Sequence, residues 1–260
     1  MIIHLNYKNV FFIGYSIIFC ECRTIALNLY IVLLIMDFII ISCIFGKTFK
    51  YVHESPGANS YFFTNNINLK NEIETKGWNY VFVNMPLSQD NITSSLQSKY
   101  IKFLIFLEDF PEFQNTQTIL YFDHKENVSS KTLNEIKLLI NDNKDKSLII
   151  RQTPSLKNNI YDEVKAALGQ PRYVKNMHLT LKFIENMIST KEISENVRVC
   201  NTGMLIFINR SNIKQLLKDV YEKCIEHQQP ECQIYWSIFS QKYKNNIKEV
   251  KWGDINSKRT

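Results

Sequence analysis

Short apolar runs rich in Ile, Val, Phe and Tyr alternate with amphipathic runs from residue 38 onward, and this order constrains the fold more than any other feature. The apolar runs have the length and polar boundaries of β-strands. Strands are expected at residues 38–45, 60–64, 79–84, 118–122, 147–151 and 197–208. Helices are expected at residues 69–75, 98–107, 132–140, 161–168, 172–189, 212–227 and 232–243. This β-α-β-α order predicts an α/β, Rossmann-like fold with a mostly parallel central sheet and helices on both faces.

Two apolar stretches, at residues 10–20 and 25–45, open the chain. The second is long enough to cross a bilayer, but Asp37 would be costly inside a membrane, and residues 38–45 have the composition of a buried strand. Three interpretations of the N-terminal extension stay open: a signal anchor within 10–36, a packed or amphipathic helical extension, or a leader upstream of a domain that starts at Met36. The expected division is an extension at 1–36, a domain at 37–250 and a polar tail at 251–260.

The charge pattern bears on the kind of partner. The chain has 31 Lys and Arg against 25 Asp and Glu, a formal net charge of +6. From residue 51 onward lysines alternate with acidic residues and form no basic block, so no nucleic-acid partner is expected. The mild positive balance fits a small anionic ligand. The 6 cysteines show no paired spacing typical of a zinc site.

Ligands of open parallel sheets bind at the carboxyl ends of the strands, so the residues that follow each expected strand are the candidates. Asp123 ends the strand at 118–122, where its carboxylate would hold Mg²⁺ or Mn²⁺ against a diphosphate, or act only as a turn residue. His124 beside it is expected in an exposed loop. Lys99 and Lys102 are three residues apart on one helix face, where they would neutralise phosphate or be solvated surface lysines.

Two further segments carry candidate residues. Gly203 interrupts an apolar run, where it permits close approach of a ligand or forms a β-bulge without function, and Asn201 can present its amide to hydroxyl groups. Glu231 follows Pro230 at the start of a helix. Its carboxylate would be a general base or hydroxyl acceptor, or only a favourable partner of the helix dipole.

Six short motifs occur in a familiar order. They are Phe-Gly at 45–46 after a strand, Phe-Thr-Asn at 63–65, Gly-Trp at 77–78, the lysine-bearing segment 99–102, Tyr-Phe-Asp at 121–123 and Asn-Thr-Gly at 201–203. In this order they resemble a glycosyltransferase-like family long catalogued as a domain of unknown function, which includes plant mucilage-related and bacterial polysaccharide-associated proteins. The resemblance covers roughly residues 38–245. The chain departs from the family pattern at Asn65, at His124-Lys125 and at Glu231-Cys232-Gln233, and no second carboxylate stands beside Asp123.

The resemblance implies a GT-A-type fold that binds a nucleotide-sugar donor and transfers its sugar to a glycan or protein hydroxyl. By that analogy Asp123 binds the divalent cation, and Lys99 and Lys102 face the phosphates. In such a reaction Glu231 is the residue expected to contact the acceptor. The remaining donor-binding residues are expected to be Phe45, Gly46, Thr64, Asn65, Asn201 and Gly203. The alternative is a catalytically silent, membrane-associated interaction protein that keeps the fold, which would bind no nucleotide.

Overall fold

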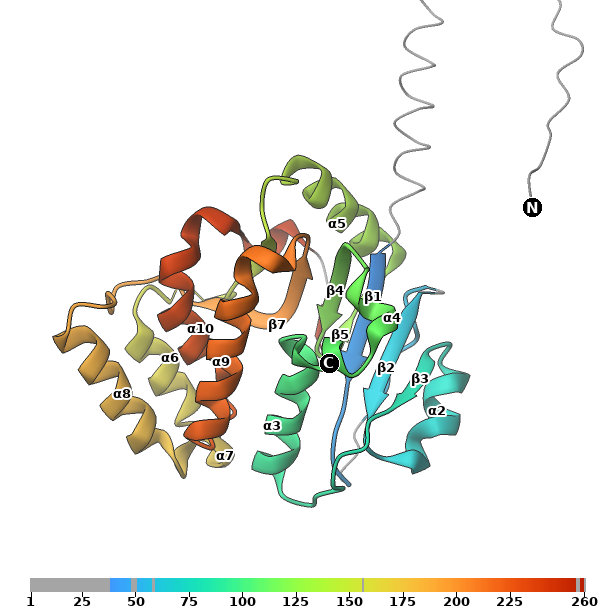
Figure 1. Ribbon diagram of the computed structural model, residues 1–260, viewed down its shortest axis with the longest axis horizontal. Coiled ribbons are helices and arrows are strands. Elements are labelled where there is room, and N and C mark those ends of the chain that lie inside the picture. The colour runs from blue at the N-terminus through green and yellow to red at the C-terminus, as the bar shows by residue number, and fades with distance from the viewer. Residues whose placement is uncertain (1–37, 48–50, 58, 156, 256–257, 260) are drawn as a thin grey trace, which may run out of the picture. The chain divides into compact units, whose positions relative to one another are not determined.

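A central sheet organises the domain (Figure 1). The computed structural model describes residues 38–47, 51–57, 59–155, 157–255 and 258–259. Within these ranges seven strands pair in the order β3-β2-β1-β4-β7-β6-β8. Their bounds are β1 Phe38–Cys43, β2 Ser60–Thr64, β3 Asn79–Phe82, β4 Thr118–Phe122, β6 Leu148–Gln152, β7 Cys200–Phe207 and β8 Ile247–Val250. None of the described helices is both long and apolar enough to span a membrane, and the apolar segment 10–36 lies outside the described residues.

The strand directions confirm the prediction of a mostly parallel α/β sheet. β1 pairs parallel with β2 and β4, β2 pairs parallel with β3, and β6 pairs parallel with β8. Only β7 runs the other way in this sheet, antiparallel to both β4 and β6. The start of β7 therefore lies at the edge where β4 and β6 end. β8 was not expected, because its short run has two exposed residues between two buried ones and gives a weak strand pattern.

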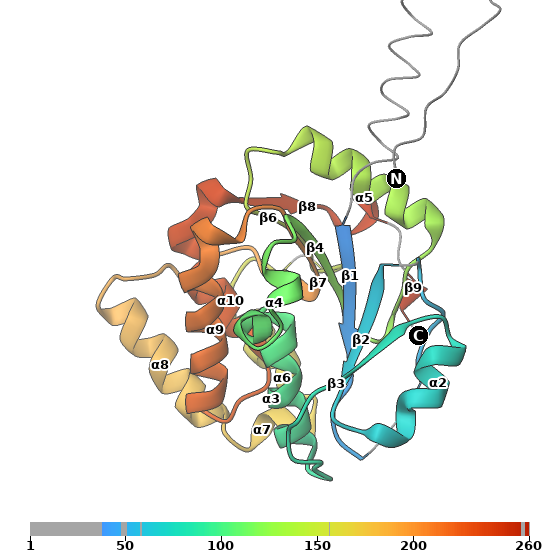
Figure 2. The same ribbon diagram turned by 45° about the vertical axis from the view of Figure 1, so that its right-hand side comes forward.

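Helices cover both faces of the sheet, as predicted (Figures 1 and 2). The α-helices are α2 Lys70–Thr75, α3 Asn91–Lys102, α4 Pro111–Gln114, α5 Ser130–Asp142, α6 Ile160–Ala167, α7 Pro171–Val174, α8 Met177–Ser189, α9 Lys214–Glu226 and α10 Cys232–Phe239. The views place α3, α9 and α10 on one side of the sheet and α2 and α5 on the other. All eight residues of β7 are buried, which fits a strand covered on both faces.

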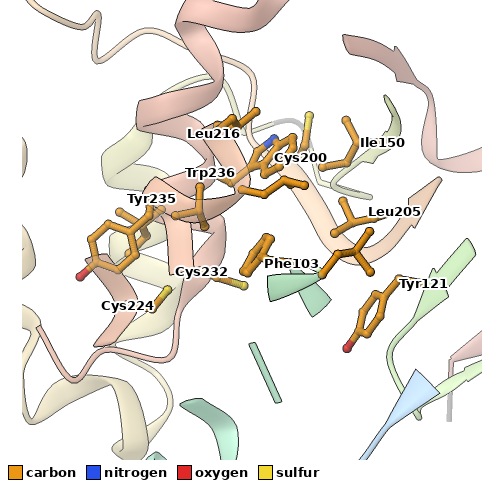
Figure 3. Packing of buried hydrophobic residues seen from close by; sticks show 14 of the residues in the cluster. Phe103, Tyr121, Ile150, Cys200, Leu205, Leu216, Cys224, Cys232, Tyr235 and Trp236 are labelled. Carbon is orange, nitrogen blue, oxygen red and sulfur yellow. The ribbon is translucent and has the colours of Figure 1, made fainter. Parts of the chain in front are cut away.

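The larger core lies between the sheet and the α3, α9 and α10 side. Figure 3 shows Ile150 of β6 and Leu205 of β7 packed near Trp236 of α10, with Tyr121 at the edge of the cluster. Trp236 is 1% exposed, so a large indole anchors α10 on the sheet. Because Tyr121 belongs to β4, and Asp123 directly follows that strand, this core also fixes the end of β4.

The expected helices differ from the observed ones in their exact bounds, and in three cases the difference exceeds two residues or divides the helix. The helix expected at 98–107 begins at Asn91, because the Asp90 carboxylate accepts the Thr93 N–H at 2.8 Å and caps it. It ends at Lys102, and Leu104 then adopts a left-handed φ of 59° that a continuing helix does not allow. The helix expected at 172–189 is divided into α7 and α8, and the last expected helix ends at Phe239 with a 3₁₀ turn after it.

The described part of the C-terminal segment, expected as a polar tail, lies against the domain. The Trp252 ring stacks on the Arg151 guanidinium at 3.7 Å from the ring centre. Ile255 is buried, and its carbonyl accepts a hydrogen bond from Arg151 at 3.4 Å. Arg151 in turn forms an ion pair of 3.1 Å with Glu126, with both side chains fully buried. Glu126 belongs to β5 Glu126–Asn127, which pairs antiparallel with β9 Lys258–Arg259.

Candidate functional site

A cavity of about 820 Å³ opens at the carboxyl edge of the sheet. Its walls include the ends of β1 and β4, the segment that follows β6, and the start of the antiparallel β7. Helix α3, the α6–α7 connection and the start of α10 complete the lining. The volume is in the range of small-molecule sites, and the position is where open α/β sheets bind ligands.

Asp123 directly follows β4 and lines this cavity. Its Oδ1 atom accepts a hydrogen bond from the Tyr121 hydroxyl at 2.7 Å and lies 2.9 Å from Lys102 Nζ. The Asp123 side chain is 31% exposed, whereas the Lys102 side chain is 4% exposed. Burial alone would raise the pKa of Asp123, but the charges of Lys102 and Lys99 outweigh it and hold the pKa well below its ordinary value. Asp123 is therefore ionised at neutral pH.

Lys99 is the second ammonium group at this point. It lines the cavity and is 8% exposed, and no hydrogen bond or ion pair holds its Nζ atom among the described residues. Burial lowers the pKa of Lys99, but Cys232, Asp123 and Glu231 around it raise the pKa above its ordinary value. The ammonium is charged at neutral pH and has no direct acceptor within the described part of the chain, so it can bind an anion that enters the cavity.

The lining as a whole favours an anion. It contains five basic and three acidic side chains. The basic ones are Lys99, Lys102, Lys125, Lys157 and Arg172, and the acidic ones are Asp123, Glu163 and Glu231. Lys157 and Glu163 pair with each other at 2.5 Å, so the other lining side chains are four basic (5 − 1) and two acidic (3 − 1) ones.

Glu231 stands on the α10 side of the cavity. Its Oε1 atom accepts the Gln233 N–H at 3.2 Å and caps α10. No other hydrogen bond to the carboxylate is found among the described residues. Burial, helped by the nearby Glu163, raises the pKa of Glu231. A carboxylate with a raised pKa that lines a cavity is suited to accept a proton.

Asn201 and Gly203 form an irregular start of β7. The register with β6 shifts between Ile150 and Arg151, so extra residues of β7 bulge out here. The Asn201 Oδ1 atom accepts the Gly203 N–H at 2.9 Å, and the Gly203 carbonyl accepts the Asp123 N–H at 2.8 Å. The bulge therefore positions the Asp123 backbone as well as lining the cavity.

The sequence-predicted donor-binding residues divide into two groups. Phe45, Lys99, Lys102, Asn201 and Gly203 line the cavity together with Asp123 and Glu231. The lining does not include Gly46, Thr64 and Asn65.

Two of these residues outside the lining, Gly46 and Asn65, belong to a hydrogen-bonded cluster beside the cavity. The Asn65 side chain accepts the Gly46 N–H at 2.9 Å and donates to the Pro86 carbonyl at 2.8 Å. Gly46 has a φ of +96°, and a Cβ there would lie 2.2 Å from Ser94 Oγ. These contacts hold the loop after β1 close to α3, which is a structural function.

One polar helix face was missed by the sequence reasoning. Asn91, Ser94, Ser95 and Ser98 of α3 line the cavity beside Lys99 and Lys102. Their spacing of three and four residues places small hydroxyl and amide groups on one side of the helix. This spacing is visible in the sequence, but three of the four residues lie before residue 98, where the helix was expected to begin.

The residues around Asp123 do not fit the divalent cation that the family resemblance implies. The described residues contain no group of three or more His, Cys, Asp or Glu side chains able to hold a metal ion. The carboxylate is already engaged by Lys102, and Lys99 and Lys125 add positive charge to the same cavity. Burial lowers the pKa of His124 to about 4, so this half-buried residue is a neutral imidazole and adds neither negative charge nor an oxygen ligand.

The chain is similar to several solved structures in its overall arrangement. No protein-family model and no curated protein matches the chain. Among solved structures, the chain is similar to mouse xyloside xylosyltransferase 1 in its apo form, with 6% identity, a TM-score of 0.43, and coverage of 83% of this chain and 85% of that one. It is also similar to a glycosyltransferase involved in the glycosylation of the major capsid of PBCV-1, with 13% identity, a TM-score of 0.37, and coverage of 82% and 80%.

A third solved structure is similar to the chain as well. For 4-diphosphocytidyl-2C-methyl-D-erythritol synthase from Anaerococcus prevotii the identity is 14% and the TM-score 0.40, with 85% of this chain and 91% of that chain covered. The TM-scores of these three structures lie below 0.5, so their similarity to the chain does not indicate its activity. The fold class and the candidate site rest on the sheet order and the cavity of this chain.

Proposed function

We propose that this protein is a GT-A-type glycosyltransferase that transfers a sugar from a nucleotide-sugar to a hydroxyl group of a glycan or protein. The observation that carries the proposal is the basic cavity at the carboxyl edge of the sheet, with the buried Lys99 ammonium in its wall. A nucleoside diphosphate has the charge and size that such a cavity accommodates. The motif order from residue 45 to residue 203 supports the same class of donor.

In the proposed reaction the donor, the acceptor and the site account for every bond and proton. The bond between the anomeric carbon and the diphosphate oxygen breaks, and its electron pair stays on the diphosphate. The anomeric carbon forms a bond to the acceptor oxygen, and the hydroxyl proton passes to the Glu231 carboxylate. Lys99 and Lys102 stabilise the negative charge that develops on the departing diphosphate.

The other lining residues position these groups. Asp123 holds the Lys102 ammonium at 2.9 Å and accepts the Tyr121 hydroxyl, so it acts through Lys102. Phe45 and Asn201 lie in the same lining and are assigned to contacts with the nucleotide and with hydroxyl groups.

The test measures nucleotide release from a panel of UDP-, GDP- and dTDP-sugars by the full chain, with a mixture of simple glycosides as acceptors. We expect release from at least one donor and a loss of about 100-fold or more in Glu231→Gln, because that variant lacks the general base. Glu112→Gln, at an exposed position of α4, is the matched control and retains the wild-type rate. If no donor binds or turns over, the proposed activity is wrong and the silent interaction protein is the better description.

A further inference from the structure

We infer that the site binds the diphosphate of its donor without a divalent cation, and that the Lys99 and Lys102 ammonium groups supply the positive charge instead. This inference rests on the proposed function, since it concerns the same donor. It is carried by three features of the cavity: the pairing of Asp123, the lack of an acceptor for Lys99 among the described residues, and the balance of charges in the lining.

The first feature is that Asp123 is already paired. The same oxygen, Oδ1, lies 2.9 Å from Lys102 Nζ and 2.7 Å from the Tyr121 hydroxyl. A cation bound to this carboxylate would have to lie beside a buried ammonium group or displace it. Lys102 is 4% exposed and forms an ion pair with no described residue other than Asp123, so displacement would leave a buried charge uncompensated.

The second feature is the Lys99 ammonium. It is more than nine-tenths buried, lines the cavity, and has no hydrogen-bond acceptor or ion-pair partner in the part of the chain that is described. An ammonium group in such a position is costly unless an acceptor oxygen meets it. Phosphate oxygens of a bound ligand provide that acceptor, and an ammonium-to-phosphate hydrogen bond is among the strong ones. A divalent cation at the same place would repel Lys99.

The third feature is the charge balance of the cavity. Mg²⁺ and Mn²⁺ take oxygen ligands, and the protein's share of these is usually one or two carboxylates that are free to coordinate the ion. Here five basic side chains face three acidic ones, and one acidic group, Glu163, is paired with Lys157. A diphosphate corrects this imbalance directly, whereas a metal ion increases it. The hydroxyl groups of Ser94, Ser95 and Ser98 on α3 add neutral donors beside the lysines.

The departure of the diphosphate from the sugar requires no metal ion at this site. When the bond between the anomeric carbon and the diphosphate oxygen breaks, the electron pair remains on the diphosphate. The two ammonium groups already face that charge and give up no proton. Asp123 is a positioning residue here, because it holds Lys102 and does not touch the diphosphate.

The experiment is isothermal titration of the full chain with UDP, GDP, CDP, dTDP and ADP, each in the presence of EDTA and again with excess MnCl₂. We expect at least one nucleotide to bind with dissociation constants that agree within about threefold between the two conditions. Binding that appears only with Mn²⁺ overturns the inference but leaves the proposed function in place. Absence of binding in both conditions overturns the proposed function and the inference with it.

Variants of the ion pair separate a positioning carboxylate from a metal ligand. Asp123→Asn keeps an amide oxygen that can accept a hydrogen bond from Lys102 in its present position, but it removes a negative charge next to the phosphates. We therefore expect its nucleotide affinity in EDTA to stay within about threefold of wild type or to increase. A metal ligand would instead show a large loss of Mn²⁺-dependent affinity, which would contradict the inference. The double variant Lys102→Met/Asp123→Asn removes both charges of the pair and preserves neutrality, and its affinity is expected to fall about tenfold. Circular dichroism of each variant confirms that it is folded.

Discussion

Two buried ion pairs in this molecule join the same kinds of groups and differ in what surrounds them. Arg151 and Glu126 meet at 3.1 Å with both side chains at 0% exposure, under the Trp252 ring and beside the Ile255 carbonyl. Lys102 and Asp123 meet at 2.9 Å, but the Asp123 side chain is 31% exposed to the cavity. The first pair is sealed by the chain itself, and the second is open on one side.

The difference shows how one interaction serves two purposes. The sealed pair joins β6 to β5 and contacts the C-terminal segment, and both of its side chains are fully buried. The open pair has a second buried ammonium nearby, Lys99, which has no acceptor in the described residues. Excess charge next to a cavity, and not burial alone, distinguishes a binding site from a structural ion pair.

The largest expected effect is at the sealed pair. Glu126→Gln leaves the Arg151 guanidinium buried without its counter-charge, and we expect a loss of about 3–5 kcal/mol in the free energy of unfolding. Urea denaturation followed by circular dichroism measures it. The double variant Glu126→Gln/Arg151→Met removes both charges and should recover most of the loss. A single-variant loss below about 1 kcal/mol would mean that the sealed pair does not stabilise the fold.

A smaller loss is expected at the open pair. Asp123→Asn also removes the counter-charge of a buried cation, but solvent and mobile anions in the cavity reach this pair. We therefore expect a loss of about 1–2 kcal/mol in urea denaturation, between the values for buried and for surface pairs. A loss as large as that of Glu126→Gln would show that the cavity does not expose the pair to solvent.

The pH dependence of the free energy of unfolding gives a second test of the open pair. The pKa of Asp123 is held below its unfolded value of about 3.9, so its stabilising contribution is present above pH 4 and is lost as the pH falls toward the lower folded pKa. The difference in unfolding free energy between wild type and Asp123→Asn should therefore shrink steadily from pH 5 to pH 2. A difference that stays constant over this range would contradict the ionised pair.

The smallest effect is expected at an exposed pair that serves as a reference for both. Lys76 and Glu54 lie 2.7 Å apart, with side chains 27% and 70% exposed. Glu54→Gln is expected to leave the urea midpoint unchanged within error, because water and salt screen an exposed pair. A measurable shift would mean that ion-pair geometry alone, without burial, contributes to the stability of this protein.

Much of the fold could be predicted from the sequence because its signals are local. The strands at 60–64 and 118–122 agree with the structure residue for residue, since each is a short apolar run bounded by polar residues. The start of α3 was missed because it depends on the capping carboxylate of Asp90 and not on an apolar period. β8 depends on pairing with β6 about one hundred residues earlier, which no local pattern shows.

The candidate site was only partly predictable for the same physical reason. The rule that ligands bind at strand ends selected Asp123, Asn201 and Gly203, which the structure places in one cavity. The engagement of Asp123 by Lys102 is a contact across 21 positions of the chain and became visible only in three dimensions. Asn65 matched a motif, yet it forms hydrogen bonds to Gly46 and Pro86 beside the cavity.

The account depends on Lys99 as an anion-binding group, and one measurement tests this directly. The affinity for the best-binding nucleoside diphosphate is compared by isothermal titration, in EDTA, between the wild-type chain, Lys99→Met and Lys131→Met, the last at an exposed position of α5. We predict that Lys99→Met binds about 10- to 100-fold more weakly and that Lys131→Met binds like wild type. Equal affinity of Lys99→Met and wild type would contradict the assignment of the cavity as a diphosphate site.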